Sequence, residues 1–167
     1  GELLTASAMG FYEDEIAKAL VLALFIPLII SSGGNSGSQA STLIIRAMAL
    51  REVRLRDWMK VFYREIGSGL ALGIILAAIG WLRIAFWPGK EDVFGEHYML
   101  IAATVSTSLI GVVMWGTMMG SMLPFILRRV GFDPASASAP FVATLVDVTG
   151  LVIYFTAAKI FLTGTLL

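Results

Sequence analysis

Four apolar segments of membrane-spanning length determine most of what this chain can fold into. They cover approximately residues 16–50, 59–87, 98–127 and 140–162. A helix needs about 20 apolar residues to cross the hydrocarbon core of a bilayer, which is about 30 Å thick. In that core every backbone polar group must be satisfied internally, and a helix does this within one segment. The pattern therefore predicts an all-α membrane protein.

The composition supports this class and excludes several others. Apolar residues make up 57% of the chain and charged residues 14%, against about 45–50% and about 25% in soluble domains. The net charge is zero, so we expect no nucleic-acid partner. Cysteine is absent, which excludes disulfides, thiolate metal sites and a cysteine nucleophile.

The first part of the chain departs from the simple pattern. A helix of about 35 residues over 16–50 would be about 52 Å long, so this segment must be tilted, interrupted or extended beyond the membrane. Residues 1–11 include an apolar stretch, Leu3 to Phe11, that is too short to span. We expect it to be the end of a helix truncated at Gly1. Counting it, the subunit would have five transmembrane helices.

Basic and acidic residues alternate between the loops. Loop 46–64 and loop 128–133 are rich in arginine, whereas Glu13 to Glu15 and residues 91–96 are mainly acidic. Cytoplasmic loops of membrane proteins carry the excess of Lys and Arg. The sequence thus predicts a multi-pass protein of a bacterial-type inner or plasma membrane. Loops 46–64 and 128–133 would be cytoplasmic and the C-terminus outside.

Asp147 is the only charged residue between Pro140 and Ala158, in the most apolar stretch of the chain. A carboxylate at membrane depth is destabilising by several kcal/mol unless it faces water, a cation or a polar partner. We therefore interpret Asp147 as a functional residue. Thr144 and Gly150, within one turn of it, are candidates to line the same pathway.

A second polar segment, SSGGNSGSQAST from Ser31 to Thr42, lies between two apolar pieces. Small residues at such spacings often only allow two helices to pack closely. That interpretation suits the glycines at 69, 73, 116 and 120. Polar groups at membrane depth otherwise line a water-filled cavity. With Asp147 in the same protein we favour a pore wall, with Gly34, Gln39 and Thr42 as candidates.

Residues 34–37 also fit GxSG, the serine motif of rhomboid intramembrane proteases. Such an enzyme needs a histidine as general base near the serine. The one histidine, His97, lies in a loop predicted to be outside the membrane. We keep the protease as a remote alternative and predict that the protein is not an enzyme.

Two long motifs, GGNSGSQASTLIIRAMAL and PFVATLVDVTGLVIYF, resemble the membrane domain of the MgtE magnesium channels. The resemblance covers nearly the whole chain. It implies five spans per subunit and a homodimer, with a pore on the two-fold axis lined by the second and fifth helices. The family's N-terminal and paired CBS regulatory domains are absent from residues 1–167, as in an excised membrane domain or a shorter relative.

The resemblance also implies a site for hydrated Mg²⁺. The waters of the ion would contact the Asp147 carboxylate, the Ala143 carbonyl, the Asn35 side chain and a carbonyl near Ser31. Ala139 occupies a position where the family often has asparagine, so one side-chain contact would be lost. The implied function is a passive, selective Mg²⁺ channel driven by the membrane potential.

Two alternatives use the same scaffold. One is a carrier for another divalent cation, such as Mn²⁺ or Co²⁺. The other is a cation/proton exchanger in which Asp147 takes up the proton. Flux coupled to pH would indicate the exchanger, whereas flux driven by voltage without proton movement would indicate the channel.

Overall fold

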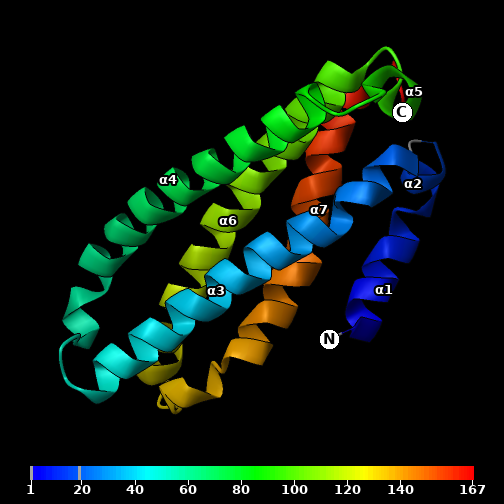
Figure 1. Ribbon diagram of the computed structural model, residues 1–167. Helices are drawn as coiled ribbons and strands as arrows, with labels where there is room; N and C mark the ends of the chain where they lie inside the picture. The colour runs from blue at the N-terminus through cyan, green and yellow to red at the C-terminus, as the bar shows by residue number, and fades with distance from the viewer. Residues whose placement is uncertain (1, 19) are drawn as a thin grey trace.

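The computed structural model describes residues 2–18 and 20–167, leaving out the side chains of residues 2 and 18. Every regular element in that part of the chain is a helix (Figure 1). The predicted all-α class is confirmed for these residues.

Four helical segments are long and apolar enough to cross a membrane. They contain α3 (Ile26–Ala49), α4 (Trp58–Ala85), α6 (Tyr98–Arg129) and α7 (Ala139–Leu162), and each falls on one of the apolar segments. Helix α1 (Glu2–Phe11) has 10 residues, too few to span. A fifth crossing therefore stays a prediction.

The long segment 16–50 is not interrupted at its glycines. Its first part consists of the end of α2 (Glu13–Lys18) and the 3₁₀ helix η1 (Leu20–Phe25), and α3 then runs unbroken through Ser31 to Thr42. The change to α-helix coincides with a proline in the first turn of α3, where its missing N–H is tolerated. The buried Tyr154 hydroxyl donates a hydrogen bond to the Leu22 carbonyl at 2.9 Å, which ties η1 to α7.

Helix α6 lies at the centre of the bundle. Helix α4 packs along one side of α6, α3 and α7 pack on the other, and α1 lies against α7 (Figure 1). The largest cluster of buried apolar side chains joins η1, α3, α6 and α7, and includes Leu22, Ile29, Leu109 and Phe155.

Glycines make the closest helix crossings. A Cβ on Gly116 would lie 2.5 Å from the Gly33 carbonyl oxygen, and one on Gly120 would overlap that of Gly37. In α4, a Cβ on Gly73 would lie 2.9 Å from the Ile110 Cα of α6. The predicted close-packing role of the 73, 116 and 120 glycines is confirmed, because only residues without a Cβ allow these approaches.

The two arginine-rich loops lie at the same end of the bundle. The α3–α4 connection contains η2 (Leu55–Asp57), and the α6–α7 connection contains η3 (Pro134–Ser136). Helix α2, helix α5 (Lys90–Phe94) and the C-terminus lie at the opposite end (Figure 1). The basic and acidic loops are thus segregated, as the proposed orientation requires, while the side of the membrane that each faces stays a prediction.

Candidate cation site

The Asp147 carboxylate of α7 lies against the backbone of α3 at Gly34. An ideal Cβ on Gly34 would be 2.5 Å from Asp147 Oδ1 and 3.8 Å from the Ala143 Cβ. The first distance is shorter than real carbon–oxygen contacts, so the carboxylate occupies space that only glycine leaves open. Gly34, Ala143 and Asp147 therefore form one contact between two helices that are far apart in sequence.

Asp147 has no partner among the described residues. Within residues 2–18 and 20–167, Lys159 and Glu15 form an ion pair at 2.7 Å, and Asp147 forms none. No hydrogen bond reaches the Asp147 carboxylate there, and its side chain is half-buried. An unpaired carboxylate about 12 Å along a membrane-length helix is destabilising unless water or a cation reaches it.

An exposed polar stripe runs along α3 beside this contact. Ser31, Asn35, Gln39 and Thr42 follow a spacing of one helical turn and are all exposed, so they share one face. The Asn35 amide donates to Ser31 Oγ at 3.1 Å, which leaves its carbonyl oxygen free to accept. Ser38, Gln39, Thr42 and Leu43 line an open hollow of about 370 Å³ on this stripe.

Two serines of the same segment fix the start of α7. Ser38 Oγ donates to the Ala139 carbonyl at 3.0 Å, and Ser41 Oγ donates to the Ala137 carbonyl at 2.7 Å. These bonds fix the N-terminal turn of α7 on α3, two turns before Asp147. Sequence reasoning missed this positioning role, although both hydroxyls lie within the polar segment. Ala139, where the resemblance implies asparagine, lies at this junction.

The remaining pore-lining candidates differ in position. Thr144 is half-buried and lies on the face of α7 that carries Ala143 and Asp147. Gly150 is buried, and a Cβ there would lie 3.2 Å from Val112 Cγ1 of α6. Gly34 is buried as well. The structure thus brings Gly34, Ala143 and Asp147 together beside the stripe, and places Gly150 against α6 instead.

The geometry leaves no catalytic pair for a serine protease. Ser36 Oγ donates to the Ser32 carbonyl at 2.7 Å. Its neighbour Gly37 packs against Gly116, whereas His97 precedes the first residue of α6. At about 1.5 Å per residue, the helix between His97 and Gly116 rises about 28 Å, far beyond hydrogen-bond reach of Ser36.

The donor set suits a hard cation. No group of three or more His, Cys, Asp or Glu residues clusters within the described part of the chain. At the contact with Gly34 the donors are the Asp147 carboxylate, the nearby Asn35 amide oxygen and backbone carbonyls of α3 and α7. Oxygen ligands of this kind suit Mg²⁺, which gives up its own water reluctantly.

Comparison with known proteins places these features in a family. The MgtE profile, described as a divalent cation transporter, matches residues 26–157. The chain is 41% identical over 160 residues to the magnesium transporter MgtE of Thermus thermophilus, covering 96% of this chain and 34% of that protein. The MgtE of Bacillus subtilis is 29% identical over 160 residues (96% and 34%), and that of Enterococcus faecalis 28% over 158 (95% and 33%). The chain thus spans about a third of the length of these curated relatives. Since the match covers most of its residues, the chain belongs to the MgtE family of divalent cation transporters.

Proposed function

We propose that this chain forms the pore of a passive, selective Mg²⁺ pathway, in which Asp147 binds the ion. The observation that carries the proposal is an unpaired, half-buried carboxylate at membrane depth beside an exposed polar stripe. Neither feature is stable against lipid, and both suit a water-filled path. The names of the related proteins, all magnesium transporters, support Mg²⁺ as the ion.

The proposed assembly is a homodimer with the pore on its two-fold axis. At the contact with Gly34 one chain supplies a single carboxylate, that of Asp147, which is an incomplete site for a divalent ion. A two-fold axis along the stripe would bring a second Asp147 to the opposite side. Two carboxylates balance the charge of one Mg²⁺ and repel each other when the ion leaves.

The ion is proposed to keep its waters at this site. Asn35 presents an amide oxygen on the stripe, and the Ser31 and Ala143 carbonyls lie within regular helix. A helical carbonyl retains a second lone pair that a water can use. Contact through waters avoids the dehydration that makes direct Mg²⁺ binding slow. It also keeps binding weak enough for the ion to leave.

The membrane potential is the proposed driving force. An inside-negative potential contributes about 2.3 kcal/mol per charge per 100 mV, or about 4.6 kcal/mol for a divalent ion. With the arginine loops inside, Mg²⁺ would move from the acidic end of the bundle to the arginine end. No second substrate or nucleotide is required for this direction.

Flux measurements in liposomes test the proposal. The protein is reconstituted with an Mg²⁺ indicator and a pH indicator inside, and a K⁺ gradient with valinomycin sets the potential. We expect Mg²⁺ influx that grows with inside-negative voltage, without a pH change. Influx that is independent of voltage but changes the pH of the lumen would contradict the channel proposal and indicate the exchanger. Stronger flux of Mn²⁺ or Co²⁺ than of Mg²⁺ would contradict the assigned ion.

A further inference from the structure

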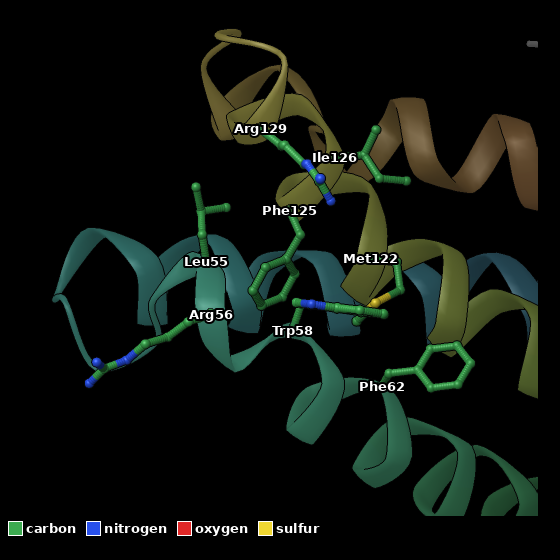
Figure 2. A pocket seen from close by; sticks show the side chains of 8 residues that line it. All are labelled: Leu55, Arg56, Trp58, Phe62, Met122, Phe125, Ile126 and Arg129. Atoms are coloured by element: carbon green, nitrogen blue, oxygen red, sulfur yellow. The ribbon is translucent and has the colours of Figure 1, made fainter.

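A cavity of about 520 Å³ lies at the arginine end of the bundle, between the start of α4 and the end of α6 (Figure 2). Its size is within the range of small-molecule sites, about 300–1,000 Å³. Most of its lining is apolar and comes from Leu55, Trp58, Phe62, Met122, Phe125 and Ile126. The proposed Mg²⁺ path uses none of these side chains.

Arginines complete this cavity and line the next one. Arg129 points in toward Phe125, while Arg56 points away (Figure 2). Leu55 also borders a second cavity, of about 490 Å³, which Arg51, Arg54 and Arg128 line. Within the described part of the chain none of these arginines forms an ion pair. The nearby Asp57 carboxylate accepts a hydrogen bond from the Arg54 backbone N–H at 3.0 Å.

The order of these groups along the bundle matches that of a phospholipid in a leaflet. The arginines lie in the loop before α4 and in the last turn of α6, where the segments leave the hydrocarbon region. Phe62 and Met122 lie one to two turns deeper along the same helices. Trp58 lies at the first residue of α4, a position typical of the membrane interface.

We propose that the paired cavities bind an anionic phospholipid of the leaflet on the arginine side. The phosphate would lie by Arg129, Arg128 and Arg54, and an acyl chain would pack on Trp58 and Phe125. A free phosphate would occupy the basic cavity alone and leave the apolar one unused. The site rests on the orientation proposed above but is independent of Mg²⁺ transport.

Quenching of Trp58 fluorescence by brominated lipids tests the site. The protein is reconstituted in unlabelled phosphatidylcholine. A small fraction of a lipid with brominated acyl chains, either phosphatidylglycerol or phosphatidylcholine, is added. The Trp58 signal is the difference between the native protein and Trp58→Phe. All samples contain EDTA, so that failure of the Mg²⁺ proposal leaves this measurement intact. We expect phosphatidylglycerol to quench Trp58 at a fraction at least about fivefold lower, because a single arginine already favours an anionic headgroup by about that factor.

Variants separate a built site from general attraction to the membrane. Arg129→Gln should abolish most of the preference for phosphatidylglycerol, and Arg129→Lys should retain most of it. Arg83→Gln should leave the preference for phosphatidylglycerol unchanged. Arg83 is an exposed arginine near the other end of α4, where it stacks on Trp87.

Four results would overturn the proposal. One is equal quenching by the two lipids, and another is an equal loss in Arg83→Gln and Arg129→Gln. A third is absence of Trp58 quenching by either lipid, as when a protein segment covers the cavity. The last is loss of the preference on adding soluble glycerol phosphate, which would assign the basic cavity to a free phosphate.

Discussion

The carboxylate of Asp147 and the backbone of Gly34 share a space too small for one more carbon atom, since a Cβ on Gly34 would lie 2.5 Å from Oδ1. This contact joins two of the helices that the family resemblance assigns to the pore. It places the carboxylate of Asp147 next to the polar stripe of α3.

Gly34→Ala should displace the carboxylate and reduce Mg²⁺ flux about tenfold. The new methyl group would overlap Asp147 Oδ1, and overpacking of this kind is destabilising by about 1–3 kcal/mol. The end of a side chain is the part most able to move, so the site should change more than the fold. Flux in liposomes measures the loss. The matched control is Gly67→Ala in α4, where a Cβ would have no neighbour within 4 Å; a similar loss there would contradict the explanation.

Asn35→Ala should weaken discrimination between Mg²⁺ and the larger Ca²⁺ while retaining flux. The change removes an exposed amide oxygen that the proposed site offers to the hydration shell. One hydrogen bond is typically worth about 1 kcal/mol, so the permeability ratio should fall about fivefold. Competition of the two ions in the liposome assay gives the ratio. The control is Thr107→Ala, which changes an exposed polar residue of α6 and should leave the ratio unaltered. An unchanged ratio in Asn35→Ala would exclude Asn35 from the site.

Gly120→Ala should destabilise the protein rather than change its ion preference. A methyl group there would overlap the carbonyl of Gly37, and backbone cannot move aside as a side chain can. We expect a loss of about 1–3 kcal/mol in the free energy of unfolding, measured by denaturant titration in detergent. Gly67→Ala serves again as the control and should be neutral or slightly stabilising, because alanine favours helix. Equal stability of the two variants would show that α3 and α6 pack less closely than described.

Tyr154→Phe should lower the free energy of unfolding by about 1–3 kcal/mol. The change removes the donor to the Leu22 carbonyl in a fully buried position, and an unsatisfied buried acceptor is destabilising by about that amount. The same titration measures the effect. Thr156→Val, at an exposed hydroxyl that bonds only within its own helix, should change stability far less. An unchanged free energy of unfolding in Tyr154→Phe would mean that the Leu22 carbonyl of η1 accepts a hydrogen bond from another donor.

The positions of the helices were predictable from the sequence. A segment that crosses the hydrocarbon core must be about 20 apolar residues long and must hydrogen-bond its own backbone, which leaves few structures other than a helix. The apolar segments at 59–87, 98–127 and 140–162 correspond to α4, α6 and α7. The position of the interruption in segment 16–50 was harder to predict from the sequence. The glycines at 33 and 34 weaken a helix in isolation, but here they face α6 and α7, and close packing stabilises the helix that they would otherwise weaken.

The candidate site was predictable as a set of residues but not as an arrangement. An isolated charge and a polar segment are visible in sequence, and each indicates a polar path. The contact between Gly34 and Asp147 depends on how α3 crosses α7, which no local pattern encodes. The packing of α7 on α6 places Gly150 against Val112, although its spacing from Asp147 had suggested a shared path. Hydroxyl bonds from Ser38 and Ser41 to the start of α7 are likewise long-range.

Voltage-driven Mg²⁺ flux of Asp147→Asn tests most directly whether the Asp147 carboxylate binds the ion. This change keeps the size of the side chain beside Gly34 and removes only its charge. We expect flux at the level of protein-free liposomes, with the free energy of unfolding retained, whereas Glu91→Gln, at an exposed position of α5, should transport normally. Mg²⁺ flux of Asp147→Asn within about twofold of the unaltered protein would contradict the assignment of Asp147 as the ion-binding residue.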